Sequence, residues 1–186
     1  MEARLIHRFA LFVILASLTS IAFAQQPAEN KKLPNFHQVN SKLYRGAQPS
    51  PGGVQQLAGL GIKTIVNLRG RGEGVRKEEA EARAVGLRFF SVPLDRMGSP
   101  DDAEIDQVLS IIDSAENQLV FVHCKQGVDR TGMVIAIYRI THDGWSSEQA
   151  KAEANRYGMH PWERGMKNYI RDYYERYRVE KKPATH

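Results

Sequence analysis

The sequence predicts a single α/β domain, in which a mainly parallel sheet of about four or five strands is flanked by helices. Short apolar runs alternate with amphipathic, helix-like segments, which is the order expected of parallel strands joined by crossover helices. One apolar run, 119–122, leads directly into a glycine-containing loop and then into an apolar helical segment. No internal repeat or low-complexity run is present, so we expect one domain.

The first elements follow from side-chain spacing. A strand is expected over 39–45. Apolar residues after Pro51 recur at helical spacing as far as Gly61, a residue type that commonly ends a helix. The run 62–68 is apolar enough for a parallel strand that is buried on both faces.

The middle of the chain repeats this alternation. A helix rich in Glu, Ala, Arg and Lys is expected over 75–85, and a strand over 88–94. The next helix is expected to open with Ser99 as its N-cap and Pro100 at its first position, followed by acidic residues in the first turn. The run 119–122 then supplies the central strand.

Three helices are expected after the central strand. They cover 133–140, 146–157 and 161–179, and in the second of them Ser146 and Gln149 have the spacing of a capping box. Ligands bind at the carboxyl ends of parallel strands, so the loops that leave the buried strands should meet at one rim. An antiparallel strand at one edge of the sheet is compatible with this pattern.

The N-terminus has the pattern of a removable signal peptide. Arg4 and Arg8 form a positive region, 9–18 is apolar, and small residues flank a cleavage site after Ala24. This pattern predicts cleavage and export, in a bacterium to the periplasm. The alternative, an uncleaved membrane anchor, would need a longer apolar stretch of about 20 residues. The expected organisation is a signal peptide over 1–24, a flexible lead-in over 25–36, the folded domain over 37–180 and a disordered tail over 181–186.

Charge and cysteine content exclude several classes. The net charge of +5 gathers toward the C-terminal end, where basic and acidic side chains are mixed. Mixed charges of this kind are typical of a solvated helix face, so we expect no nucleic-acid partner and no stable membrane insertion after cleavage. A single cysteine excludes an intramolecular disulfide, and we expect a monomer held together by its core.

The loop after the central strand carries the chemistry. It contains Cys124, the only cysteine, and Arg130, with five residues between them. If the backbone N–H groups of this loop point inward, they form an anion-binding nest at the N-terminus of the following helix. The residues expected to contribute to phosphate binding are Lys125, Gln126, Gly127, Val128, Asp129 and Arg130.

Each neighbouring side chain has an expected role. A thiol that normally titrates near ~8.5 falls to roughly 3.5–7.5 beside cations at a helix N-terminus, which would make Cys124 nucleophilic. The planar fork of Arg130 suits two oxygens of a phosphoryl group. The hydroxyl of Thr131 can stabilise the sulfur as a leaving group, and His123 is expected to brace the loop from behind.

The pattern His-Cys-x5-Arg-Thr resembles the signature of the cysteine-dependent protein tyrosine and dual-specificity phosphatase superfamily. The segment Tyr-Arg-Gly-Ala-Gln-Pro, residues 44–49, is similar to the entry segment of small dual-specificity phosphatases. The resemblance implies a phosphocysteine intermediate that water hydrolyses, with no metal and no other cofactor. A rhodanese-type sulfurtransferase is the nearest alternative, but its loop is one residue shorter.

The resemblance also implies a carboxylic acid on a loop between an earlier strand and helix, which would protonate the leaving group. Asp95 stands in that place, five residues before Pro100, where the family more often shows four. Asp101 and Asp102 are the alternatives, although both suit the first turn of a helix.

Two questions about the site stay open. Lys125 and Asp129 are similar to residues of phosphatases that act on phosphoinositides, so phosphotyrosine and mixed phosphoprotein substrates are expected first, and phosphoinositides or inositol phosphates second. A non-catalytic phosphate-binding module is a further alternative.

Arg69, Arg71 and Arg96 could widen the anion field, although each alone is typical of a solvated surface arginine. His160 and the tyrosines over 169–177 are interpreted as structural.

Overall fold

The structure is a computed structural model that describes residues 31–95 and 99–181. The predictions made for the signal peptide over 1–24, for most of the lead-in, for Arg96 and for nearly all of the tail fall outside the described residues. They stay predictions from the sequence. The remainder of the chain forms the expected α/β domain.

A five-stranded sheet has the order β1-β2-β5-β3-β4. Its strands are β1 (His37–Gln38), β2 (Leu43–Gly46), β3 (Thr64–Asn67), β4 (Arg88–Ser91) and β5 (Val120–His123). The short β1 pairs with β2 antiparallel, and every other pairing is parallel. The prediction of a mainly parallel sheet with an antiparallel edge is therefore confirmed.

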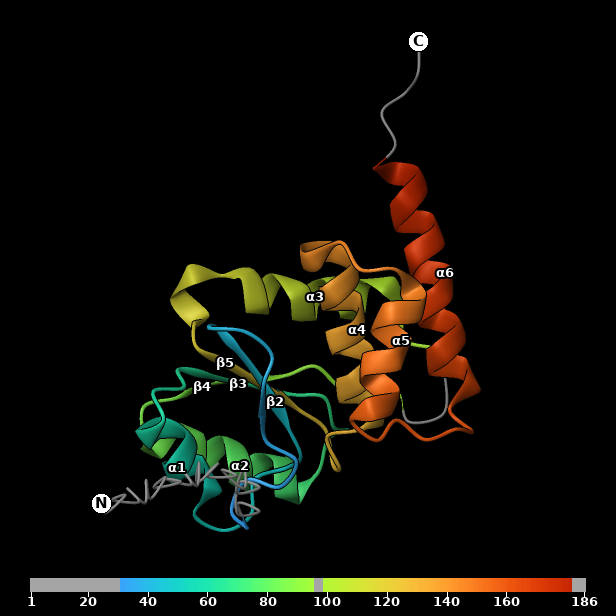
Figure 1. Cartoon of the computed structure of the whole chain (residues 1–186). Helices are drawn as coiled ribbons and strands as arrows, with labels where there is room; N and C mark the ends of the chain where they lie inside the picture. Colours follow the sequence, from blue (N-terminus) through green and yellow to red (C-terminus); the bar gives the residue numbers. More distant parts are fainter. Residues whose placement is uncertain (1–30, 96–98, 182–186) are drawn as a thin grey trace, which may run out of the picture.

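Helices cover both faces of this sheet. They are α1 (Gly53–Gly59), α2 (Glu73–Ala84), α3 (Asp102–Asp113), α4 (Asp129–Asp143), α5 (Ser147–Arg156) and α6 (Arg164–Glu180). Figure 1 shows α1 and α2 on one face, and α3 to α6 gathered on the other. The last turns of α6 extend beyond the body of the domain in the same view.

Each face of the sheet has its own apolar core. The larger core packs α3, α4, α5 and α6 against the sheet, and Val122 and Ile137 are among its fully buried members. The smaller core packs α1 and α2 against the opposite face around Phe121, Leu57 and Ile65. The central strand β5 contributes to both cores, which explains why its residues are apolar on both faces.

The first strand differs from the prediction. The sequence suggested one strand over 39–45, but β2 begins at Leu43 and a turn separates it from β1. The side-chain oxygen of Asn40 accepts the N–H groups of Lys42 and Leu43, both at 2.9 Å. This turn satisfies backbone donors that a continuous strand would have left for a neighbour.

Two helix starts also differ. Asp101, rather than Ser99, is the N-cap of α3, and its backbone N–H donates to the Glu104 carboxylate at 3.0 Å. Helix α4 was expected over 133–140 but already begins at Asp129 and continues to Asp143. Asp129, Arg130 and Thr131 therefore lie in the first turn of a helix rather than in a loop.

The two C-terminal helices follow the predicted pattern in part. The capping box of α5 is present, with Ser146 Oγ accepting the Gln149 N–H at 3.3 Å. Helix α6 begins at Arg164 instead of Pro161, because a turn in which the Glu163 N–H bonds the His160 carbonyl at 3.2 Å precedes it.

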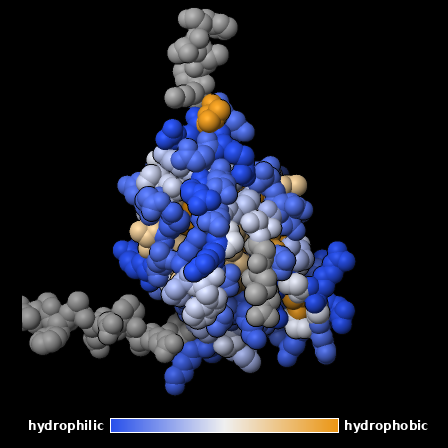
Figure 2. Space-filling model, turned by 90° about the vertical axis from the view of Figure 1, so that its right-hand side faces the viewer, coloured by the Kyte–Doolittle hydropathy of each residue, from blue (hydrophilic) through white to orange (hydrophobic). Residues whose placement is uncertain are grey.

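The surface is mainly polar. Figure 2 shows apolar side chains only as scattered spots on the face that it presents. Within 31–95 and 99–181 the exposed large hydrophobic residues are Leu60, Trp162 and Val179. None of the helices in that described part combines the length and the apolar character required to cross a bilayer.

The carboxyl ends of the strands meet as predicted. The Leu68 N–H bonds the His123 carbonyl at 2.9 Å, and the Leu94 N–H bonds the Leu68 carbonyl at 3.3 Å. The loops that leave β3, β4 and β5 are thus joined at one rim. Gly46 at the end of β2 lies directly behind Gly127, where an added Cβ would approach the Gly46 carbonyl to 2.4 Å.

Candidate active site

A cavity of about 220 Å³ opens at this rim. It is far larger than the roughly 10–15 Å³ of cavity that one water molecule needs, so a phosphate group can enter. Loops after β3 and β5 and the starts of α4 and α6 form its wall. The residues that line it are Arg69, Gly70, Arg71, Cys124, Lys125, Gln126, Asp129, Arg130, Glu163 and Met166.

The loop after β5 has its carbonyl groups held outward. Gln48 donates its backbone N–H to the Lys125 carbonyl at 3.3 Å. The side-chain amide of Asn35 donates to the Gln126 and Gly127 carbonyls, each at 3.2 Å. Successive carbonyls that point away from the cavity leave the N–H groups free to face it, which is the arrangement of an anion nest.

A buried arginine completes this outer support. Arg45 on β2 donates from Nη2 to the Gly127 carbonyl at 2.9 Å, and its guanidinium stacks over the Tyr157 ring at 4.5 Å. Burial lowers the pKa of Arg45 to about 10, so the group keeps its charge at neutral pH. A positive group therefore stands behind the loop on the side away from the cavity.

Gly127 is required by geometry. Its φ of +73° lies in the left-handed region, and an added Cβ would meet the backbone of Gly46 and Ala47 within 2.5 Å. Only glycine avoids both the strain and the collision. The Gly127 N–H turns toward Cys124 Sγ at 3.3 Å, and Val128 follows as the N-cap of α4.

Cys124 is almost fully buried at the base of the cavity. Burial by itself raises the pKa of its thiol, but the hydroxyl and backbone N–H of Thr131, the charge of Arg130 and the Gly127 N–H lower the pKa below its ordinary value. The Thr131 hydroxyl is buried and has no other partner among the described residues, so it is left for the sulfur. This environment favours a thiolate nucleophile.

Arg130 is anchored at one end. It is buried, and its Nη1 donates to the Leu68 carbonyl at 3.0 Å. The anchor fixes the guanidinium plane along the wall of the cavity beside Cys124. A planar fork in that position can donate to two oxygens of a phosphoryl group bound on the sulfur.

His123 braces the loop from behind, where the sequence had placed it. Its side chain is 0% exposed, and Nδ1 lies 3.0 Å from the Cys124 carbonyl. Its Nε2 lies 2.7 Å from Glu78 Oε1 of α2, a partner that the sequence analysis did not identify. Because His123 and Glu78 are both buried, the pair fixes the orientation of the ring.

His160 has a partner that the sequence did not reveal. Its Nδ1 lies 2.9 Å from Asp129 Oδ2, its backbone N–H donates to Asp129 Oδ1 at 2.9 Å, and its ring stacks on Trp162 at 4.5 Å. Asp129 therefore ties the start of α4 to the segment before α6. That segment brings Glu163 to the wall of the cavity.

The three candidate acids are distributed unequally. Asp95 is exposed and follows β4, immediately before residues that the structure does not describe, and its role as acid stays a prediction. Asp101 caps α3. Asp102 accepts hydrogen bonds from the Tyr169 hydroxyl at 2.6 Å and from Arg176 at 2.8 Å, so its carboxylate is engaged with α6 and away from the cavity.

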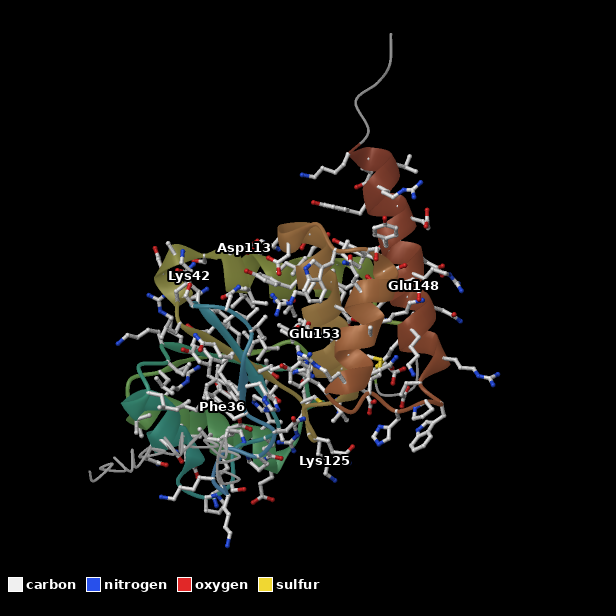
Figure 3. The ribbon with its side chains drawn as sticks, in the orientation of Figure 1. Phe36, Lys42, Asp113, Lys125, Glu148 and Glu153 are labelled. Carbon is white, nitrogen blue, oxygen red and sulfur yellow. The ribbon has the colours of Figure 1, made fainter. Side chains whose placement is uncertain are left out.

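Cations exceed carboxylates around the cavity. Arg69 and Arg71 leave β3 and line the wall, where the sequence had placed them as candidates. Lys125 is exposed, and Figure 3 shows it at the outer end of the loop, with its side chain directed away from the sheet. Within the described residues no group of three or more His, Cys, Asp or Glu could hold a metal ion.

Sequence reasoning missed the residues that support the loop from outside. Asn35, Arg45 and Gln48 come from the N-terminal segment, which is far from the loop in sequence, and only a fold brings them together. Glu78 left a signal, since it stands at helical spacing between the apolar residues Val75 and Ala82. A charged residue at a core position indicates a buried partner.

Comparison with known proteins agrees with this geometry. The curated "Dual specificity protein phosphatase TpbA" of Pseudomonas aeruginosa is 35% identical over 126 residues, which cover 67% of this chain and 55% of that protein. "Inositol diphosphatase DSP4" of Arabidopsis thaliana is 29% identical over 110 residues, 56% of this chain and 54% of that protein. The chain thus spans about half the length of these relatives.

Solved structures show the same fold. The crystal structure of a P. aeruginosa TpbA variant in complex with pTyr superposes with a TM-score of 0.64 at 30% identity, and covers 82% of this chain and 91% of that one. A family model described as "DSP-PTPase phosphatase fused to NAD+ Kinase" matches residues 15–172. With most of its length matched, and with the cysteine loop built as described above, the chain belongs to this family of dual-specificity-type cysteine phosphatases.

Proposed function

We propose that the protein is a phosphoric monoester hydrolase that acts on phosphotyrosine and mixed phosphoprotein substrates through a phosphocysteine intermediate. One observation carries the proposal: the buried Cys124 faces a loop whose carbonyls are held outward, beside an anchored Arg130. The relative TpbA, named as a dual-specificity phosphatase, supports it.

The chemistry proceeds in two steps. The Cys124 thiolate attacks phosphorus, the P–O bond to the leaving group breaks, and a carboxylic acid gives that oxygen its proton. Arg130 and the inward N–H groups stabilise the charge on the equatorial oxygens, which is the larger contribution in sites of this kind. Water then attacks the phosphocysteine, its proton passes to the same carboxylate, and the Thr131 hydroxyl stabilises the departing thiolate.

The nucleophile is tested by Cys124→Ser. Without the thiolate, turnover of p-nitrophenyl phosphate should fall by on the order of 10⁴ or more. The variant should still bind phosphotyrosine, because the loop is intact, and calorimetry measures that binding. Assays contain EDTA, since the proposed mechanism uses no metal. Activity that survives the substitution, or is lost only on adding EDTA, contradicts the mechanism, and binding without any wild-type turnover would indicate a phosphate-binding module.

The acid is tested by Asp95→Asn. Loss of a positioned acid should lower kcat for phenyl phosphate by roughly 10²–10⁴, because phenoxide leaves poorly without a proton. The effect should be much smaller for p-nitrophenyl phosphate, whose leaving group needs no proton. Asp101→Asn is the matched control, because it removes a carboxylate from the cap of α3. If the control shows the leaving-group dependence and Asp95→Asn does not, the assignment to Asp95 is wrong.

A second candidate function is hydrolysis of inositol phosphates or phosphoinositides. It is favoured by the cations of the cavity: Arg69, Arg71 and Lys125 line it in addition to Arg130, which exceeds what one phosphate requires. Extra point charges stabilise extra phosphates. The relative named as an inositol diphosphatase also favours this candidate.

A substrate panel separates the two candidates. It compares phosphotyrosyl and phosphoseryl peptides, phosphoinositides and soluble inositol phosphates for the wild type, Lys125→Ala and Arg71→Ala. We expect phosphotyrosyl peptides to have the highest kcat/KM. The two substitutions should lower kcat/KM for polyphosphorylated substrates more than for phosphotyrosyl peptides. A tenfold wild-type preference for inositol substrates, about 1.4 kcal/mol, would reverse the order of the candidates.

We place this reaction in a bacterial periplasm, on the strength of the leader pattern over residues 1–24. Cleavage after Ala24 would leave a chain that begins at Gln25. Mass spectrometry of the protein recovered from periplasmic extracts measures this directly. A full-length mass, or recovery only from the cytoplasm, would contradict export.

A further inference from the structure

Glu78 lies where an apolar residue is expected. On α2 it shares the buried face with Val75 and Ala82, and its side chain is 4% exposed. A buried carboxylate is costly unless charged groups compensate for the lost water. Two nitrogen-bearing side chains approach it, and both belong to the candidate active site.

The first group is His123. Its Nδ1 faces the carbonyl of Cys124 at 3.0 Å and its Nε2 faces Glu78 Oε1 at 2.7 Å, while its ring stacks on Phe121 at 5.4 Å. The Cys124 carbonyl on one side and the Glu78 carboxylate on the other therefore hold the two nitrogens of the ring, and Phe121 fixes its plane.

The second group is Arg69. Its Nη1 lies 3.6 Å from Glu78 Oε2 and has no hydrogen-bond partner among the described residues. Arg69 also lines the cavity that contains Cys124. One carboxylate thus lies between the ring behind the cysteine loop and a cation in the cavity wall.

We propose that Glu78 is a positioning residue of this active site, which holds the His123 ring in place behind the Cys124 carbonyl and keeps Arg69 directed along the cavity wall. The inference rests on the proposed function, since it assigns Glu78 to the cysteine chemistry. It predicts that the carboxylate, without touching substrate, sets the reactivity of the thiol and the affinity for phosphate.

The charges that face Cys124 make this effect measurable. Arg130 approaches from α4, Arg45 from β2, and the His123–Glu78 pair from β5 and α2, with the His123 ring on the side of the loop. Lys125 is exposed on the solvent side. If the carboxylate is removed, the His123 ring loses the partner that holds it against the Cys124 carbonyl, and the loop around the thiolate is fixed less well.

The experiment measures alkylation of Cys124 by iodoacetamide as a function of pH in the full-length protein and in Glu78→Gln. The chain has one cysteine, so the rate reports this thiol alone. We expect the midpoint pH of Glu78→Gln to rise by about one unit, which makes the rate below both midpoints about tenfold slower. In Glu78→Gln, inorganic phosphate should protect Cys124 from alkylation about threefold less well than in the wild type, because Arg69 loses its partner Glu78.

Glu79→Gln is the matched control. Glu79 neighbours Glu78 on α2 but is partly exposed and pairs with Arg83 at 2.6 Å, so its removal should change neither the midpoint nor the protection. A second control combines Glu78→Gln with His123→Asn. If Glu78 acts through the His123 ring, adding Glu78→Gln to His123→Asn should not change the midpoint pH of Cys124 alkylation further. A shift that persists in the His123→Asn background overturns the route through His123.

A folded Glu78→Gln protein whose midpoint and phosphate protection match those of the wild type overturns the proposal. If Glu78→Gln does not fold, Glu78→Asp replaces it, since it keeps the charge but shortens the reach to His123. The same upward shift is then expected at smaller size, and an unchanged midpoint contradicts the proposal. Neither the alkylation midpoint nor the protection by phosphate requires turnover. A wild-type protein without phosphatase activity would therefore refute the proposed function, and these two measurements would still test the role of Glu78.

Discussion

The site depends on one set of hydrogen bonds, those that hold the carbonyls of the cysteine loop outward. The Asn35 side-chain amide donates to the Gln126 carbonyl and the Arg45 guanidinium to the Gly127 carbonyl. The Gln48 backbone N–H donates to the Lys125 carbonyl. With the carbonyls so engaged, the N–H groups can face the cavity and the helix dipole of α4 adds to their potential. The thiolate and the phosphate are then stabilised by backbone that was oriented before any ligand arrives, which is the condition for efficient electrostatic catalysis.

This constraint explains features that otherwise oppose stability. Arg45 is 1% exposed and, among the described residues, its Nε and Nη1 have no hydrogen-bond partner. Gly127 has a left-handed backbone and touches the Gly46 carbonyl region so closely that no side chain fits. Buried charge and glycine both reduce the free energy of unfolding, so their presence beneath the loop is better explained by geometry for catalysis than by packing.

Much of this could be predicted from the sequence, because the signals are local. A few adjacent residues were enough to predict three features that the structure contains. The apolar run before Cys124 predicted a strand, the spacing from Cys124 to Arg130 predicted the loop, and Ser146 predicted a helix cap. The start of α4 could not be found in this way, since Asp129 and Arg130 interrupt the apolar pattern while already in helical conformation. Asn35 and Glu78 were missed because their partners are distant in sequence.

Charged side chains are distributed differently on the two sides of the cysteine loop. On the inner side of the loop, Arg71 and Lys125 present cations to the cavity from exposed positions, where water screens them. On the outer side, Arg45 and His123 are buried, and the charge of Arg45 acts more strongly there because water does not screen it. The buried residues hold the loop in place, and the exposed cations lie where additional phosphates of a substrate would meet them. For the proposed reaction, substitutions of the exposed cations should therefore alter specificity while turnover is preserved, and substitutions behind the loop should alter turnover of every substrate.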